Sequence, residues 1–172
     1  MRTPIAHGFT LPELLITLCL LAILLSVALP NLHQYLHSNR QENLRHSLLS
    51  HLKATRNDAI TRMQRLEFCG SSNGQDCDQA WSNGWLIREP SSNTVLRYTQ
   101  QPGHERLRWA GAGQANPSIV YLANGTTAAS NGRFVLCNAE QRVAWQLVIN
   151  RQGRVRQVIG LENGQNDSEL CR

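Results

Sequence analysis

The 172-residue sequence lacks the motifs on which common enzyme and metal sites are built. It has no glycine-rich phosphate loop, no nucleophile elbow, and no HExxH or CxxC spacing. His33 and His37 are four residues apart and could share one face of a helix, but no third ligand follows at a suitable spacing. We therefore expect no enzymatic activity, no bound metal and no cofactor.

The sequence is also poor in lysine, because Lys53 stands alone beside sixteen arginines. A guanidinium group can hold a phosphate through two parallel hydrogen bonds, whereas an ammonium group acts as a point charge. The formal net charge of +5 and the pI near 9.3 favour an acidic partner such as nucleic acid or anionic lipid. A GC-rich genome would produce the same excess of arginine, so composition alone leaves both explanations open.

Charge is nearly absent from residues 9–29, where Glu13 is the single charged side chain. At about 1.5 Å per residue, a helix of this length just spans the apolar core of a bilayer. Arg2 precedes the apolar run, so we expect the N-terminus to stay in the cytoplasm and the rest of the chain to be exported. Pro30 follows, and we expect it to bend the helix rather than to end it.

Beyond Pro30 the apolar residues recur mostly at steps of three and four, with arginine and glutamate between them. This is the pattern of an amphipathic helix with a polar outer face. We predict one helix from about Leu11 to Leu66, apolar on all sides at first and on one side later. The predicted stripe consists of Leu32, Leu36, Leu44, Leu48, Leu52, Ala59, Ile60 and Met63.

From Cys69 onward, turn signals replace the helical pattern. Five Asn-Gly pairs occur among short strand-like runs, which is typical of antiparallel sheets. The expected strands are Trp85–Arg88, Thr94–Tyr98, Leu107–Trp109, Ile119–Leu122, Phe134–Cys137, Val143–Ile149 and Arg154–Ile159. The predicted fold class is α+β, with a long N-terminal helix packed on a C-terminal head of antiparallel sheet.

Four of the five cysteines lie in this head, while Cys19 belongs to the apolar run. An even number of cysteines in an exported head suggests two disulfides, and four cysteines allow three pairings. We favour Cys69–Cys77 because that pair is local. We favour Cys137–Cys171 because that pair ties down the C-terminus.

Residues 8–13 read Gly-Phe-Thr-Leu-Pro-Glu, which resembles the processing site of type IV prepilins. The resemblance implies that a prepilin peptidase cuts after Gly8 and methylates the new terminus, Phe9. It also implies that Glu13 stays inside the membrane and pairs with the amino terminus of a neighbouring subunit, since a lone carboxylate there is costly. Pro12 departs from the aliphatic residue usual in the family, but the first helical turn tolerates proline.

Two other readings of the N-terminus compete with this one. An ordinary secretory signal could be cut after Ser26-Val27-Ala28, although Glu13 near the start of the apolar run argues against it. A plain membrane anchor would leave the Gly-Phe-Thr-x-x-Glu sequence unexplained.

The head, with its paired cysteines and strand-rich C-terminal half, resembles the GspH/FimT group of type IV minor pilins and pseudopilins. The resemblance implies two small antiparallel sheets beside the helix, and other minor and major pilins as partners. The expected organisation is a leader (1–8), a transmembrane segment (9–30), an amphipathic helix (31–66) and a periplasmic head (67–172). The protein would cross the bacterial inner membrane once and enter a pilus at the cell surface.

Residues 153–156, Gly-Arg-Val-Arg, resemble the Gly-Arg-x-Arg motif of the DNA-binding FimT branch, and they lie near the C-terminus as in that branch. Val143–Asn150 and Arg154–Gly160 are expected to form a hairpin around Arg151-Gln152-Gly153. Alternation would place Arg154 and Arg156 on one face, opposite Val155 and Ile159, with Arg151 reaching the same groove. The predicted DNA-binding residues are Arg142, Arg151, Gly153, Arg154 and Arg156.

The function predicted from the sequence is that of a minor type IV pilin that binds double-stranded DNA during uptake for natural transformation. Because no base-reading helix is evident, binding should be independent of sequence and dominated by phosphates. The alternative is a structural minor pilin, or a GspH-like type II secretion pseudopilin, that primes filament assembly without binding DNA. In that case the arginines would guard an edge strand against aggregation.

Overall fold

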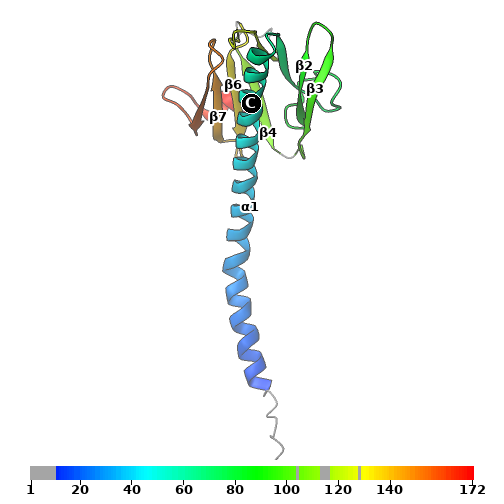
Figure 1. Cartoon of the computed structure of the whole chain (residues 1–172). Helices are drawn as coiled ribbons and strands as arrows, with labels where there is room; N and C mark the ends of the chain where they lie inside the picture. The colour runs from blue at the N-terminus through cyan, green and yellow to red at the C-terminus, as the bar shows by residue number, and fades with distance from the viewer. Residues whose placement is uncertain (1–10, 104, 113–116, 128) are drawn as a thin grey trace, which may run out of the picture. The chain divides into compact units, whose positions relative to one another are not determined.

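The computed structural model describes residues 11–103, 105–112, 117–127 and 129–172. The chain divides into two compact units, Met1–Glu42 and Asn43–Arg172. Among the described residues, helix α1 (Leu11–Thr61) is followed by eight strands and a short C-terminal helix (Figure 1).

In the first unit, the described residues form the N-terminal part of α1. Their large apolar side chains are exposed, as for Leu11 at 72 % and Leu24 at 68 %, and Glu13 lies in the first turn. Within the described ranges, no helix is both long enough and apolar enough to cross a membrane. Gly8 and Phe9 lie outside those ranges, so the processing site and the 9–30 membrane segment stay predictions.

In the second unit, the C-terminal part of α1 packs on the head through one stripe. Leu44, Leu48, Leu49, Leu52 and Ala59 are buried, which agrees with the amphipathic pattern. They belong to one apolar cluster that also contains residues of both sheets. The helix therefore contributes a face to the core of the head.

Helix α1 ends at Thr61, five residues earlier than predicted. Met63 takes a left-handed conformation (φ 53°), which lets its N–H donate to Ile60 O (3.2 Å) while the N–H of Gln64 donates to Ala59 O (3.1 Å). This is a Schellman cap, which usually has glycine at the left-handed position, so no residue type marked the end of the helix in advance. Met63 is 82 % exposed and does not extend the predicted stripe.

The strands form two four-stranded antiparallel sheets. The first has the order β3-β2-β1-β5 and the second the order β4-β6-β7-β8. Their bounds are β1 Leu66–Gly70, β2 Gly84–Glu89, β3 Thr94–Gln100, β4 Arg106–Gly111, β5 Ile119–Tyr121, β6 Gly132–Cys137, β7 Val143–Ile149 and β8 Val155–Ile159. The predicted α+β class with two small sheets is confirmed. Strand β1 was missed, because its first residue was assigned to the helix.

An aromatic cluster joins the two sheets. Trp81 contacts Phe134 of β6 edge-on, with ring centroids 4.8 Å apart, and Phe68 of β1 at 5.6 Å. Trp85 of β2 is 1 % exposed. These rings are part of the packed core, where they are unavailable for stacking on bases.

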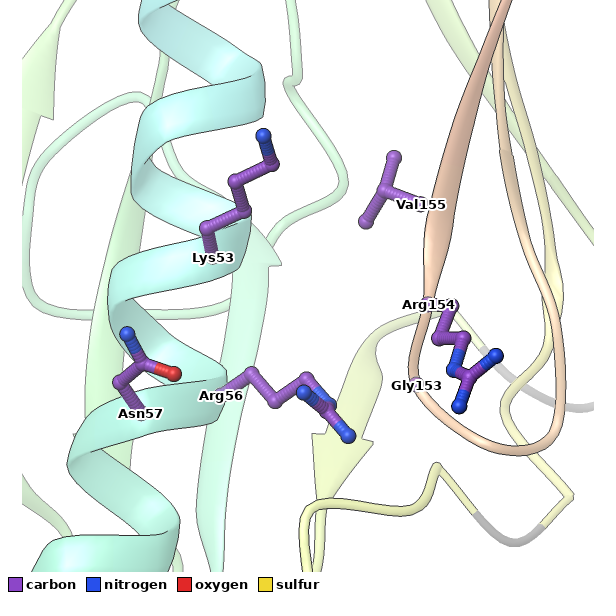
Figure 2. Close-up of a pocket in the computed structure, with 6 residues that line it drawn as sticks. All are labelled: Lys53, Arg56, Asn57, Gly153, Arg154 and Val155. Atoms are coloured by element: carbon purple, nitrogen blue, oxygen red, sulfur yellow. The ribbon is translucent and has the colours of Figure 1, made fainter.

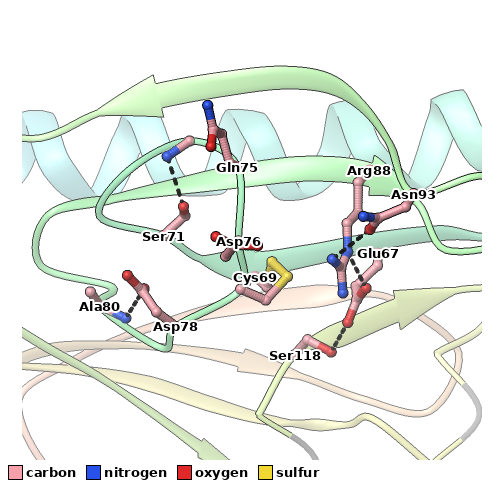
Figure 3. Close-up of a disulfide and its surroundings, with 12 residues drawn as sticks. Glu67, Cys69, Ser71, Gln75, Asp76, Asp78, Ala80, Arg88, Asn93 and Ser118 are labelled. Carbon is pink, nitrogen blue, oxygen red and sulfur yellow. Dashed lines mark hydrogen bonds and ion pairs between the residues drawn. A yellow bond between two sulfur atoms is a disulfide. The ribbon is translucent and has the colours of Figure 1, made fainter.

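Two disulfides close the head, and they join the pairs favoured from the sequence. Cys69–Cys77 closes the loop after β1, where the Asp78 carboxylate accepts from the N–H of Ala80 (2.9 Å; Figure 3). Cys137–Cys171 ties the end of β6 to the residue that follows α2, Asp167–Leu170. The C-terminus is thereby fixed to the second sheet.

Replacing both Cys137 and Cys171 with serine should lower the free energy of unfolding by about 3–4 kcal/mol, because the bridge closes a long loop of the unfolded chain. The matched change at Cys69 and Cys77 should cost roughly 1 kcal/mol less, since its sequence separation is 8 rather than 34. Urea unfolding of the full-length protein, followed by tryptophan fluorescence, measures both. An equal or larger loss at Cys69–Cys77 would contradict the loop argument.

Candidate functional site

The predicted arginine hairpin is present at the end of the second sheet. β7 and β8 pair antiparallel, with Ile149 opposite Val155. In the turn between them, the N–H of Gly153 donates to Asn150 O (2.9 Å), and the N–H of Asn150 donates to Arg154 O (3.1 Å). The Asn150 side chain accepts from the N–H of Arg154 (2.9 Å), so the tip is a closed, internally bonded turn.

Gly153 is buried, and it lets the hairpin tip approach its neighbours closely. Its φ of +74° favours glycine, and a Cβ there would collide with Gly125 O and lie 3.0 Å from Arg56 Nε. Tyr121 is fully buried beside it, and burial raises the pKa of the Tyr121 hydroxyl well above its usual value. The glycine of the Gly-Arg-Val-Arg segment thus has a packing role.

The backbone of the hairpin tip is held by the loop after β5 and by α1. Thr127 donates from its N–H to Arg151 O (3.0 Å) and from its hydroxyl to Asn150 O (3.0 Å). Arg56 of α1 donates from Nε to Gly125 O (2.9 Å) and from Nη2 to Gln152 O (3.4 Å). These bonds use carbonyl groups, so they leave the exposed side chains of the tip for other partners.

A cationic groove lies between α1 and the hairpin tip (Figure 2). Its lining residues are Lys53, Arg56, Asn57, Gly153, Arg154 and Val155. Lys53 and Arg56 extend from α1 towards the hairpin, and no lining residue is acidic. Arg151 is exposed at the turn itself, and no other described residue forms a hydrogen bond or ion pair with its guanidinium or that of Arg154. The Arg154 side chain points away from α1, so the cations line the two sides of the groove and do not meet at one point (Figure 2). A group of cations with no acidic residue among them suits an oxyanion, above all a phosphate.

Sequence reasoning missed the α1 side of this groove. Lys53 and Arg56 lie about a hundred residues before the hairpin, so no local motif connects them with Arg154. The available signal was helical spacing: both positions directly follow buried stripe positions, Leu52 and Thr55. They therefore flank the face that packs on the head.

Arg156, which was predicted to share the tip with Arg151 and Arg154, is not among the lining residues of the groove, and its guanidinium has a partner within the protein. Arg156 Nη1 pairs with Glu162 Oε1 at 2.5 Å, and Glu162 Oε2 lies 3.7 Å from Arg133 Nη1. The hydrogen bond between Arg156 and Glu162 raises the pKa of the arginine and lowers the pKa of the carboxyl group. In this structure the Arg156 charge is thus already matched within the protein.

The alternation predicted along β8 is present, with one unexpected exposure. Arg156 is exposed, while Val155 packs against the core. Ile159 lies on the same face as Val155 and is opposite the buried Trp145 of β7, yet it is 67 % exposed, because β8 is an edge strand with no neighbouring strand on its outer side among the described residues.

The structure does not bring Arg142 to the groove. Arg142 lies in the turn before β7, where its N–H donates to the Asn138 side chain (2.8 Å). At about 3.3 Å per residue, the length of β7 separates it from the hairpin tip by roughly 25 Å. Of the five predicted DNA-binding residues, only Arg151, Gly153 and Arg154 are therefore together.

Comparisons with known proteins address the fold and the family. The family described as type II transport protein GspH matches residues 45–153, so Arg154 and Arg156 lie just beyond the matched range. A crystal structure of the type IV minor pilin FimU from Pseudomonas aeruginosa is 19 % identical, with a TM-score of 0.55, and the match covers 78 % of this chain and 94 % of that one. A second crystal form of FimU is 18 % identical, with a TM-score of 0.52, and the match covers 74 % of this chain and 94 % of that one. No curated protein matches the chain in sequence.

Proposed function

The chain belongs to the family of the type II transport protein GspH, and within that family of minor pilins and pseudopilins we propose that it binds DNA. Membership implies a structural, membrane-anchored protein that assembles with other pilins into a filament. Our proposal adds that its head binds double-stranded DNA, without sequence preference, during uptake for natural transformation.

The observation that carries this proposal is the cationic groove at the hairpin tip. Lys53 and Arg56 line its α1 side and Arg154 lines its hairpin side, Arg151 is exposed beside it, and none of its lining residues is acidic. Phosphates lie along every DNA duplex whatever its sequence, so a cluster of cations alone can bind it. Contacts to phosphates position a protein without reading bases, which fits a site with no base-reading element among its lining residues.

The groove is small, and its affinity should be correspondingly low. Lys53, Arg151 and Arg154 can each contact one phosphate, while Arg56 is engaged with two backbone carbonyls. A site of this size is expected to bind with a dissociation constant on the order of 10⁻⁴ to 10⁻⁶ M at physiological salt. Several copies in one filament would raise the effective affinity through avidity.

The experiment is a fluorescence anisotropy titration of two short duplexes of unrelated sequence with the full-length protein in a nonionic detergent. We expect the same weak affinity for both duplexes. A strong preference for one duplex would contradict a phosphate-only site. Absence of binding even at low salt would support the alternative, a structural minor pilin or secretion pseudopilin that primes filament assembly. The observation that favours this alternative is that β8 is an edge strand, where charged residues also prevent unwanted strand pairing.

We propose the same N-terminal organisation as the prepilin resemblance implies. Residues 1–8 are a leader, 9–30 cross the inner membrane once, and the head lies in the periplasm. Glu13 is exposed in the first turn of α1, where it can pair with the amino terminus of a neighbouring subunit. A carboxylate within an apolar helix needs such a partner, which would also fix the stagger between subunits.

A bulky substitution of Gly8 should leave the leader attached, because the peptidase cuts after this residue. Mass spectrometry of the membrane fraction should find N-methylated Phe9 as the first residue of the parent and uncut chain in the variant. A mature terminus at Leu29 would instead show that an ordinary signal peptidase processes the chain.

A further inference from the structure

Two arginines of the second sheet, Arg133 and Arg156, both pair with one carboxylate of the protein, that of Glu162. Glu162 lies between two guanidinium groups, with Oε1 2.5 Å from Arg156 Nη1 and Oε2 3.7 Å from Arg133 Nη1. Two guanidinium groups that converge on one carboxylate can also converge on one phosphate, since both anions accept the same forked hydrogen bonds.

The register of the sheet brings the two arginines to one row. Arg133 of β6 is opposite Val148 of β7, and Val148 is opposite Arg156 of β8. Two strand spacings of about 4.8 Å therefore separate their backbones, and alternation places both side chains on the same face. Arg154 precedes Arg156 by two residues, so this row begins about 7 Å from the tip groove.

Glu162 is held over this row by a network of side chains. Gln165 Oε1 accepts from the N–H of Glu162 (3.0 Å) and from Gln146 Nε2 (2.7 Å). Gln146 is fully buried, donates also to Gly160 O (2.8 Å), and accepts from Arg133 Nη1 (2.9 Å). The segment after β8 is thus fixed to the sheet, and Glu162 is aimed at the two arginines.

We propose that Arg133 and Arg156 form a second phosphate subsite, and that DNA reaches it by displacing Glu162 from the two guanidinium groups. The subsite would extend the duplex from the tip groove onto the outer face of the sheet. It rests on the proposed function, because it names further contacts of the same DNA. The Arg156 side chain is 59 % exposed and that of Glu162 is 28 % exposed. Water therefore weakens this ion pair, and a phosphate can reach the arginine and take the place of the carboxylate.

Removing the competing carboxylate should strengthen DNA binding. For Glu162→Gln we expect an affinity about two- to five-fold higher than that of the parent, the effect of releasing one exposed ion pair. Glu140→Gln is the matched control, because it removes the same charge from the exposed turn between β6 and β7. Arg133→Gln or Arg156→Gln should each lower the affinity more in the Glu162→Gln background than in the parent, where the carboxylate already occupies the arginines.

The measurement is anisotropy of a labelled duplex with the full-length proteins in nonionic detergent at one salt concentration, with thermal melting of each variant to verify the fold. The subsite is supported if Glu162→Gln raises DNA affinity, Glu140→Gln does not, and adding Arg133→Gln to Glu162→Gln reverses the increase. The subsite is overturned if Glu162→Gln raises DNA affinity no more than Glu140→Gln does. If Arg151→Gln and Arg154→Gln leave DNA affinity unchanged, the proposed groove is overturned. The comparison of Glu162→Gln with Glu140→Gln would still decide the subsite.

Discussion

Replacing Gly153 with alanine should lower the free energy of unfolding by about 2–5 kcal/mol and abolish DNA binding. The left-handed backbone at this position costs an alanine about 1–2 kcal/mol. The new methyl group would also collide with Gly125 O and crowd Arg56, and such overpacking costs about 1–3 kcal/mol more. The strain would be relieved by moving the hairpin tip away from α1, which would open the cationic groove.

Gly164→Ala is the matched control for this prediction. Gly164 has a similar left-handed backbone (φ +83°), but a Cβ there would have no atom within 4 Å. Its substitution should therefore show the backbone cost alone, about 1–2 kcal/mol, and leave DNA binding unchanged. Urea unfolding and anisotropy of the two variants make the comparison. Equal losses of stability would show that close packing of the tip does not explain why Gly153 is a glycine.

Replacing Arg151 and Arg154 together with glutamine should lower DNA affinity at fixed salt by roughly tenfold or more, because two of the three available phosphate contacts are lost. Both side chains are exposed and the tip is held by its backbone, so the head should keep its melting temperature. Cells that carry the variant should still assemble filaments but fail to take up labelled DNA.

The matched control removes two arginines elsewhere on the head. Arg97 is exposed on β3, and Arg142 is exposed in the turn before β7, far from the tip. If Arg97→Gln with Arg142→Gln reduces affinity as much as the tip variant does, binding follows net charge and the groove has no special role.

The sequence predicted those features that local patterns encode. The β7–β8 hairpin followed from alternation around a turn with glycine, and the antiparallel strands followed from Asn-Gly turns between short apolar runs. Their division into two sheets was implied only by the family resemblance. The end of α1 was misplaced because Met63 caps the helix where glycine is usual, so the chain carries no residue that marks the stop.

The composition of the site depended on contacts that no local pattern encodes. Lys53 and Arg56 join the groove through packing of α1 on the head, across a long sequence separation. Arg156 was assigned to the tip from the Gly-Arg-Val-Arg motif and from alternation, and its partner Glu162 lies outside that motif. Alternation gives the face on which an arginine lies, but it does not show which carboxylate the chain will fold back over that face.

The most direct test of the account is the salt dependence of DNA affinity for the full-length protein and its Arg151→Gln, Arg154→Gln variant, between about 50 and 200 mM salt. Three phosphate contacts in the groove predict a slope of log affinity against log salt of about −2.7 or steeper for the parent, at roughly 0.9 per contact. The slope of the variant should be less steep by about 1.8, because two of these contacts are lost. A variant with the slope and affinity of the parent would contradict the claim that the hairpin tip holds DNA by its phosphates.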